Sequence, residues 1–230
     1  RSWVVGDHER IYNTTDGGNN WTQQNSGTFL NDLHSVHFTD FNNGWAVGNN
    51  GTILKTNDGG ENWNLQTSGT QRTLYSVNFT SDATGWVVGD NGTILKTSDG
   101  GINWESESSE TNHNLKSVFF RNTMSGWTVG TGGIILNRGT DWNIQTIGGN
   151  AQNLISVYFT DANTGWAVGN VGTILKTING GTSWNSQNSG TENLLTSICL
   201  INDVTGWTAG NNGTILKTND GTNWYQLESG

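Results

Sequence analysis

One sequence pattern recurs six times along the chain, and it restricts the fold more than any other feature. Its clearest copy, GWAVGNNGTILKTNDGGENW, runs from Gly44 to Trp63, and close copies stand at 85–104, 165–184 and 206–224. Weaker copies stand at 2–21 and 126–142, and the two Trp positions of the pattern account for all 12 Trp of the chain. A Trp that recurs at the same place in every copy indicates core packing, so the chain is predicted to be an array of units of about 41 residues.

Each unit contains the signals of four short strands. L-x-S-V-x-F, as at 74–79, predicts a first strand; GW(A/V)VG predicts a second, TILKT a third, and the residues from the second Trp onward a fourth. Asn and Gly between the second and third strands tolerate the positive φ of a tight hairpin turn. Because no helical periodicity interrupts these signals, the pattern is typical of a propeller blade.

A second motif, Ser/Thr-x-Asp-x-Gly-x-x-Trp, lies between the third and fourth strands. Its Asp can accept backbone N–H bonds inside the turn, its Gly supplies a left-handed backbone, and its Trp covers the loop. The motif is degenerate at 137–142, and one copy has Asn in place of Asp, which this type of turn accepts. The residues assigned to this structural role are Asp16, Asp58, Asp99, Asn179, Asp220, Trp21, Trp63, Trp104, Trp184 and Trp224.

These motifs resemble Asp boxes, also called BNR repeats, which occur in sialidases, sortilin-type receptors and many secreted propellers. The combined pattern is most similar to the propellers of photosystem II assembly and stability factors, a family also common as domains of secreted bacterial proteins. The resemblance covers nearly the whole chain and implies a fold much more strongly than an activity. In the photosystem-type relatives seven blades are usual.

We therefore predict an all-β, six-bladed β-propeller of four-stranded units, formed by residues 1–230 as a single domain. The units are about 1–31, 32–72, 73–113, 114–152, 153–193 and 194–230. The first blade is expected to be incomplete at its N-terminal strand, because no first-strand motif precedes Trp3. We accordingly expect the chain to be a domain or fragment of a larger protein.

Composition argues against several classes of function. A net charge of −9 is unsuited to neutralising phosphates, so no nucleic acid partner is expected. No apolar run approaches the roughly 20 residues that span a bilayer, so no membrane insertion is expected either. The lone Cys199 excludes an internal disulfide, and its strand-like surroundings predict a buried, unreactive thiol.

No catalytic constellation is recognisable in the sequence. A sialidase needs a cluster of arginines, whereas the five Arg here are scattered along the chain. Most carboxylates belong to Asp boxes or to turns between the first and second strands, and the four His contain only one close pair, His34 and His37, on opposite faces of a strand. We predict a chain that is not an enzyme and that has no metal site and no cofactor.

Positions at which the repeats differ are the best candidates for ligand contacts. In propellers the connections between blades share a face with the turns between second and third strands, and this face is the usual binding face. The first copy replaces the Asn-Gly turn by four polar residues, and polar residues also stand in two inter-unit connections. The resulting candidates are Asp7, His8, Glu9, Arg10, Arg72 and His113. A turn that has lost its glycine, with solvated side chains, remains an open alternative.

First-strand residues also vary between copies, at His34 and Tyr75 among others, and one such set is expected to line the central channel. The predicted function is a non-catalytic binding or scaffold propeller that recognises a protein or a glycan, in an extracellular or periplasmic protein. The alternatives are a multivalent lectin, a glycoside hydrolase and a photosystem-type assembly factor. The oligomeric state is not predicted.

Overall fold

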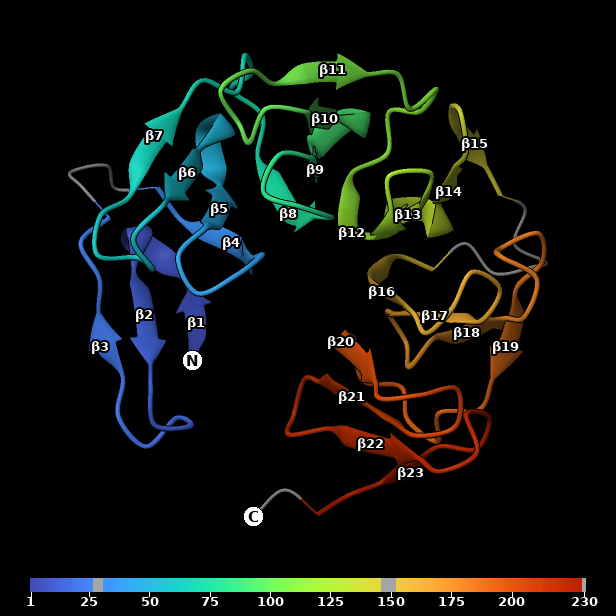
Figure 1. The fold of residues 1–230 in the computed structure, drawn as a ribbon. Helices are drawn as coiled ribbons and strands as arrows, with labels where there is room; N and C mark the ends of the chain where they lie inside the picture. Colours follow the sequence, from blue (N-terminus) through green and yellow to red (C-terminus); the bar gives the residue numbers. More distant parts are fainter. Residues whose placement is uncertain (27–30, 146–151, 229–230) are drawn as a thin grey trace. The chain divides into compact units, whose positions relative to one another are not determined.

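The computed structural model describes residues 1–26, 31–145 and 152–228, in which strands are joined by turns and short 3-10 segments. The chain divides into two compact units, Arg1–Ser108 and Ser109–Gly230. Each unit contains three antiparallel sheets, and the strands of each sheet follow one another in sequence order, as the colours of Figure 1 show. No helix among the described residues has the length and apolar character needed to cross a membrane.

The N-terminal unit holds one three-stranded and two four-stranded sheets. The first sheet contains β1 (Ser2–Val5), β2 (Ile11–Thr14) and β3 (Thr22–Gln23). The second contains β4 (Leu33–Phe38), β5 (Gly44–Gly48), β6 (Ile53–Thr56) and β7 (Asn64–Gln66). The third contains β8 (Leu74–Phe79), β9 (Gly85–Gly89), β10 (Ile94–Thr97) and β11 (Glu105–Glu107).

The C-terminal unit holds three four-stranded sheets. The first contains β12 (Leu115–Asn122), β13 (Ser125–Gly130), β14 (Ile135–Arg138) and β15 (Trp142–Ile144). The second contains β16 (Leu154–Phe159), β17 (Gly165–Gly169), β18 (Ile174–Thr177) and β19 (Asn185–Gln187). The third contains β20 (Leu195–Leu200), β21 (Gly206–Gly210), β22 (Ile215–Thr218) and β23 (Tyr225–Gln226).

The strands thus confirm the predicted four-stranded unit and the incomplete first blade. Every four-stranded sheet begins with the L-x-S-V-x-F segment or its variant and continues with GWxxG. The first sheet begins directly with SWVVG, the counterpart of GWxxG. The short 3-10 segments η1 (Asp7–Glu9), η2 (Asn49–Gly51), η3 (Asp90–Gly92) and η4 (Thr131–Gly133) form turns between the GWxxG strand and the next strand.

Neighbouring sheets within a unit pack face to face through the two repeated motifs. Trp45 of the second sheet is fully buried and stacks on Phe79 of the third, with ring centroids 3.7 Å apart. Trp127 and Phe159 make the same contact in the C-terminal unit at 3.6 Å. Stacked aromatic rings contribute to stability beyond the apolar area that they bury, so the aromatic residues compensate for the low apolar content of the chain.

In four copies the indole N–H of the first Trp also bonds to the Asp box of the next sheet. Trp45 Nε1 donates to the carbonyl oxygen of Gly100 at 3.1 Å. The same contact recurs from Trp3 to Gly59, from Trp127 to Gly180 and from Trp166 to Gly221, at 3.3, 3.0 and 3.2 Å. The sequence predicted these tryptophans as core residues, and the structure adds a directional bond to each contact.

The Ser of L-x-S-V-x-F makes a second bond between sheets. Ser35 Oγ accepts a hydrogen bond from the backbone N–H of Val77 at 3.3 Å, and Ser117 and Ser156 accept equivalent bonds in the C-terminal unit. The serine therefore recurs because it links the first strand of one sheet to the first strand of the next.

The Asp boxes have the predicted geometry. In the second sheet, Asp58 Oδ1 accepts bonds from the Thr56 hydroxyl (2.7 Å) and the Asn62 backbone N–H (3.0 Å). The Thr56 hydroxyl oxygen accepts the N–H of Gly60, whose φ of +93° favours glycine. Asn179 accepts the corresponding bonds from Thr177 and Ser183, so an amide closes the turn as well as a carboxylate does.

Two residues are more exposed than the sequence suggested. Cys199 is exposed, so the prediction of a buried thiol is wrong. It alternates on β20 with the buried Ile198 and Leu200, and therefore points to the opposite face of the last sheet in its unit, where no further sheet of that unit covers it. Trp21 is 42% exposed, because the first sheet has no first strand with a Phe to pack on it, as Phe38 packs edge-on against Trp63.

Candidate ligand-binding face

The candidate face of the N-terminal unit is formed by the turns η1, η2 and η3 and by the connections that lead into β4 and β8. We call it the turn face. In each turn the second residue has a left-handed backbone, with φ of +56° at His8, +54° at Asn50 and +53° at Asn91. Asn and His are both enriched in this conformation among residues other than glycine. The sequence change in the first copy therefore alters the side chains of the turn and leaves its backbone conformation as in the other copies.

Each inter-sheet connection lies against a turn. The backbone N–H of Asn49 donates to the carbonyl oxygen of Asp32 at 2.9 Å, and that of Asp90 donates to Thr73 at 2.9 Å. The prediction that connections and turns share one face therefore holds within the N-terminal unit. The side chains of both elements can meet a ligand on that face.

A β-bulge aims one first-strand side chain toward the turn in each four-stranded sheet of the N-terminal unit. The pairing register shifts between Leu33 and Ser35 and between Leu74 and Ser76, which leaves His34 and Tyr75 in bulges. Such bulges re-aim side chains next to functional sites. The register shifts at the same position in the other three four-stranded sheets.

Polar side chains form a continuous row across the turn face. The Asp32 carboxylate accepts bonds from the backbone N–H of His8 (3.0 Å) and from Asn49 Nδ2 (3.2 Å). His34 Nε2 bonds to Asn49 Oδ1 at 2.8 Å, which requires the proton on Nε2. The His34 ring lies 5.6 Å from the ring of Tyr75. We call these residues, together with Asp90, the polar row.

Tyr75 ends the row on the third sheet. Its hydroxyl donates to Asp90 Oδ1 at 2.7 Å. Burial together with this contact to a carboxylate raises the pKa of Tyr75 to about 12, so the hydroxyl keeps its proton at all physiological pH values. The row thus offers two carboxylates, an exposed imidazole and an aromatic ring held in fixed positions.

The predicted site residues of the N-terminal unit all lie on the turn face but do not form one cluster. Asp7, His8 and Arg10 are exposed around η1, and Glu9 belongs to the same turn. Arg72 instead reaches η3 and the start of β10, where its Nη1 donates to the Asn91 carbonyl and to Thr93 Oγ1, each at 3.2 Å. His8 joins the polar row through its backbone N–H, which donates to Asp32.

His113 belongs to the C-terminal unit. Its exposed ring packs against Gly132 of η4, and its Nδ1 lies 3.5 Å from Thr131 Oγ1. His113 therefore occupies a connection of the predicted kind in its own unit. Its role in ligand contact, like that of the other five candidates, stays a prediction.

The sequence did not single out Asp32, His34, Asn49, Tyr75 and Asp90 as one site. His34 and Tyr75 are recognisable as variable first-strand residues, but their contacts with the turn depend on the bulge. A signal for the bulge was present: Leu33, Val36 and Phe38 are spaced by three and then two residues, whereas an unbroken strand repeats its core positions every two.

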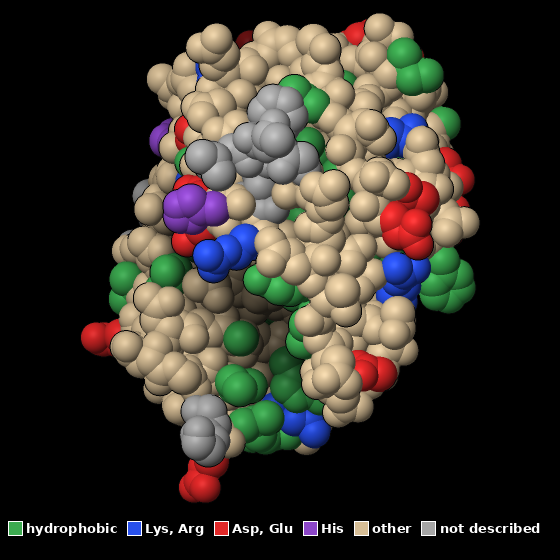
Figure 2. All heavy atoms as spheres, turned by 90° about the vertical axis from the view of Figure 1, so that its left-hand side faces the viewer, with side chains coloured by type: hydrophobic (Ala, Val, Ile, Leu, Met, Phe, Trp, Pro, Cys, Tyr) green, Lys and Arg blue, Asp and Glu red, His purple; other side chains and the backbone are tan. Residues whose placement is uncertain are grey.

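The surface charge is dispersed. On the face shown in Figure 2, basic side chains stand apart among acidic and uncharged ones and form no continuous patch. Among the described residues, no group of three or more His, Cys, Asp or Glu could hold a metal ion.

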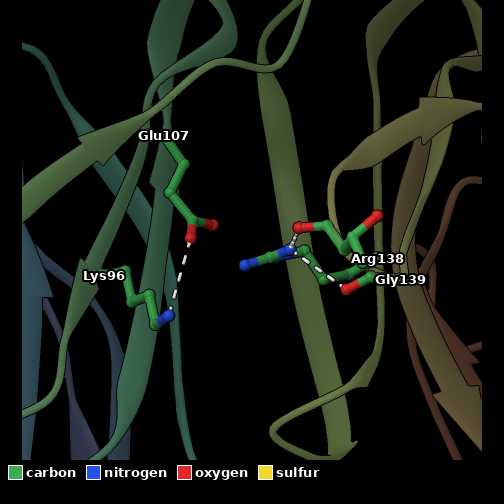
Figure 3. A network of polar contacts seen from close by, with 5 residues as sticks. Lys96, Glu107, Arg138 and Gly139 are labelled. Carbon is green, nitrogen blue, oxygen red and sulfur yellow. Dashed lines mark hydrogen bonds and ion pairs between the residues drawn. The ribbon is translucent and has the colours of Figure 1, made fainter.

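Several charged groups near the sheets have structural partners. In the N-terminal unit Lys96 Nζ lies 3.8 Å from Glu107 Oε1. In the C-terminal unit Arg138 Nη1 donates to the carbonyl oxygen of Gly139 at 3.1 Å, and Figure 3 draws both contacts. The second contact belongs to the degenerate Asp box, where an arginine bonds to turn carbonyls in place of the missing Asp. Asp40 of the β4–β5 turn accepts the N–H groups of Asn42 and Asn43, which lower its pKa.

Solved structures with similar folds are propellers and related proteins. The structure of YCF48 bound to D1 peptide is 21% identical, covering 97% of this chain and 76% of its own, with a TM-score of 0.78. YCF48 from Cyanidioschyzon merolae is 19% identical over 94% of this chain and 78% of its own, with a TM-score of 0.75. An ancestral GH74 enzyme is 15% identical over 98% of this chain but 36% of its own, with a TM-score of 0.76. A search of curated proteins found no match.

These similarities and the sheet order define the class: the protein is an all-β propeller of six blades, the first of which has three strands. At such identities the solved structures show the fold alone. The family follows from the sequence, because the model of the photosynthesis system II assembly factor YCF48 matches residues 1–65, 61–147 and 137–229. The chain belongs to this family, as its Asp-box pattern suggested.

Proposed function

We propose that this chain is a non-catalytic propeller that binds an extended segment of a partner protein on its turn face. The observation that carries the proposal is the polar row, in which Asp32, Asn49 and Asp90 fix the side chains of a site without any arrangement suited to bond cleavage. Family membership supports a binding role, and so does the similar solved structure of a YCF48 bound to D1 peptide.

The chemistry of the row favours a particular kind of segment. Asp32 and Asp90 accept hydrogen bonds and carry negative charge, and the chain as a whole has a net charge of −9. The rings of His34 and Tyr75, with centroids 5.6 Å apart and planes inclined by 36°, offer two aromatic faces. A peptide with basic or amide side chains and an aromatic or aliphatic residue between them meets all of these groups.

A protein partner fits the repeats better than a glycan does. A multivalent lectin requires the same binding residues in each blade, whereas the repeated turn residues here are Asn and Gly with backbone roles. The bulge residues differ from blade to blade: they are His34, Tyr75, Lys116, Ile155 and Thr196. A surface that varies along its length suits one extended, irregular ligand. An extracellular or periplasmic location stays part of the proposal, to be tested by cell fractionation.

A displayed random peptide library first selects peptides that bind the intact chain. Isothermal titration calorimetry then measures the affinity of the intact chain for these peptides and for a D1 peptide. Asp32→Ala and Tyr75→Phe should each weaken binding by about tenfold or more, because each loses a hydrogen bond that involves a charged group. Tyr225→Phe, which changes an exposed tyrosine of the C-terminal unit, is the matched control for Tyr75→Phe.

The proposal fails if no peptide binds, or if binding is unchanged by both substitutions in the polar row. A glycan array with clear hits that compete with no peptide would assign the turn face to a sugar instead.

A further inference from the structure

The turn between the first and second strands of a sheet lies against the Asp box of the same sheet. In the C-terminal unit, the backbone N–H of Gly180 donates to the carbonyl oxygen of Asn163, and that of Gly221 donates to Val204, each at 2.9 Å. These turns and the Asp boxes therefore share one face, which we call the Asp-box face. Because successive strands are antiparallel, this face lies at the opposite end of the sheets from the turns between second and third strands.

The Asp-box face of the C-terminal unit carries most of the exposed large apolar side chains in the described part of that unit. Met124, Ile201 and Val204 stand in turns between first and second strands, with exposed fractions of 60, 72 and 46%. Ile178, at 69%, stands in the Asp box of the second sheet. At the opposite end of these sheets, the described turns expose one such residue, Val171. Apolar exposure is therefore concentrated at one end of the sheets.

Two of these residues line a groove between adjacent turns. β16 and β20 lie next to each other (Figure 1), and the turns that follow them, 160–164 and 201–205, bound a groove of about 500 Å³. Ile201 and Val204 line the groove together with Tyr158. Its volume is within the range of ligand-binding pockets. Every strand around it is paired within its own four-stranded sheet, so no strand of the repeat is missing at this place.

Ile201 replaces a residue that other copies use inside the turn. The equivalent residue of the preceding sheet is Thr160, whose hydroxyl donates to the carbonyl oxygen of Thr164 at 3.3 Å. Thr80 makes the same bond in its own turn at 3.4 Å. Ile201 has no hydroxyl, yet its backbone N–H donates to the carbonyl oxygen of Thr205 at 2.9 Å, as that of Thr160 does to Thr164 at 3.1 Å. Folding of the turn therefore does not account for an exposed isoleucine.

A carboxylate stands on each side of the groove. Asp161 lines it from the β16–β17 turn, and Asp203 lines it from the β20–β21 turn. The backbone N–H groups of Thr164 and Asn163 lower the pKa of Asp161, so this side chain is ionised at neutral pH. Within residues 1–26, 31–145 and 152–228, no ion pair involves either carboxylate. The groove thus combines apolar walls with negative charge.

Two basic side chains near these carboxylates are bound to backbone carbonyl groups. Arg121 Nη1 donates to the carbonyl oxygen of Thr160, and Lys176 Nζ donates to that of Gly221 at 2.9 Å. These cations reduce the negative potential of the groove but form no ion pair with Asp161 or Asp203 in the described part of the chain. Both carboxylates can therefore accept a cation from a ligand.

We propose that this groove binds an extended segment of a partner protein in which an apolar residue stands between basic residues. The apolar side chain packs between Ile201, Val204 and Tyr158 and removes their exposed surface from water. Lys or Arg side chains before and after it reach Asp161 and Asp203 on the two sides of the groove. The net charge of −9 attracts a basic partner before contact is made. This site lies outside the polar row and does not depend on the proposed function of the turn face.

The experiment is an NMR titration of the intact chain, labelled with carbon-13 at the methyl groups of Ile and Val. The probe is the acetylated and amidated peptide Gly-Lys-Leu-Lys-Gly, added to millimolar concentration. We expect saturable shifts of the Ile201 and Val204 methyl signals, and weaker binding at high salt because the carboxylates are near the surface. Gly-Lys-Ser-Lys-Gly and Gly-Glu-Leu-Glu-Gly are the control peptides, and each should bind about fivefold more weakly or less.

Ile201→Thr is the decisive variant, because threonine occupies this position in the preceding sheet and can form the bond within the turn. It should not lower the thermal midpoint, and it should weaken probe binding by about fivefold or more. Ile178→Thr is the matched control, since Ile178 is exposed to a similar degree and lines a different groove. Asp161→Asn should weaken binding by about twofold to fivefold and keep the turn, because Asn202 accepts the equivalent N–H bonds in the next sheet.

The proposal is overturned if no methyl signal of the groove shifts at millimolar probe, or if Ile201→Thr leaves the affinity unchanged. Equal binding of the peptide with Glu in place of Lys would refute a basic partner. A dimer of the free chain that sedimentation detects and Ile201→Thr dissociates would assign the groove to a second copy of the chain instead. Asp32→Ala and Tyr75→Phe should not change binding of the probe, so failure here and failure of the turn-face proposal give different results.

Discussion

Replacing Trp45 by Phe tests whether the indole bond between sheets contributes to stability beyond the packing of the ring. Trp45 is fully buried, and its Nε1 donates to the carbonyl oxygen of Gly100 at 3.1 Å. The substitution removes part of a buried ring, which costs about 1 to 2 kcal/mol at the conservative end of large-to-small changes in a core. It also leaves the Gly100 oxygen without its donor, which adds about 1 to 3 kcal/mol. We expect a total loss of about 2 to 5 kcal/mol in the free energy of unfolding.

Trp63→Phe is the matched control in the same unit. Trp63 is also buried, at 7% exposure, but its Nε1 has no hydrogen-bond partner among the described residues. This substitution deletes the same atoms and abandons no acceptor, so it should cost only the packing part. Trp166→Phe gives an intermediate case, because the Gly221 oxygen also accepts bonds from Lys176 Nζ (2.9 Å) and Gln187 Nε2 (3.2 Å).

The assay is urea unfolding at constant temperature, followed by far-UV circular dichroism so that the loss of a fluorophore does not matter. The predicted order of destabilisation is Trp45→Phe, then Trp166→Phe, then Trp63→Phe. If Trp45→Phe and Trp63→Phe cost the same, the bond to the Asp box makes no net contribution and the reasoning is wrong.

Three further outcomes are expected. Val171 is β-branched and has φ of +53°, a left-handed conformation that suits Asn better, so Val171→Asn should raise the free energy of unfolding by about 0.5 to 1 kcal/mol. Val204→Asn, which changes another exposed valine, is the control and should not raise the thermal midpoint. Gly85→Ala places a Cβ 2.5 Å from the Phe79 ring and should cost about 1 to 3 kcal/mol in urea unfolding, whereas Gly139→Ala should be nearly neutral. The N–H of Asn62, with its side-chain amide and the Thr56 hydroxyl, lowers the pKa of Asp58 from 3.8 to about 2, so its contribution to stability is complete above pH 3.8 and lost as the pH falls toward 2. Asp16 and Asp99 behave alike, so the urea midpoint should fall over this range, and fall less in Asp58→Asn; a midpoint that stays constant from pH 4 to 2 would contradict this.

The fold could be predicted from the sequence because the same strand and turn signals recur in six copies of the repeat. Turn glycines, strand motifs and Asp boxes each recur with the spacing that their geometry requires, and the missing first strand was evident from the position of Trp3 alone. The burial of Cys199 could not be predicted locally, because it depends on whether a sheet of the same unit covers the outer face of β20.

Less of the candidate site could be predicted from the sequence. Asp7, His8, Arg10 and Arg72 were correctly placed on turns and connections, since spacing alone locates them. The contacts of His34 and Tyr75 depend on a bulge, which a regular strand pattern does not predict. Which side chains bond to one another across different sheets is a property of packing, and no local motif encodes it.

The bonds from Trp3, Trp45, Trp127 and Trp166 to the following Asp box run forward along the chain, and the bonds that Ser35, Ser117 and Ser156 accept likewise join consecutive sheets. A structure held in this way behaves thermodynamically as a one-dimensional array, in which each interface has its own free energy and responds only to its two sides. Substitutions at separate interfaces should then add, while those at one interface should couple. A blade could therefore change its turn residues and acquire a new ligand at a stability cost confined to its own neighbours.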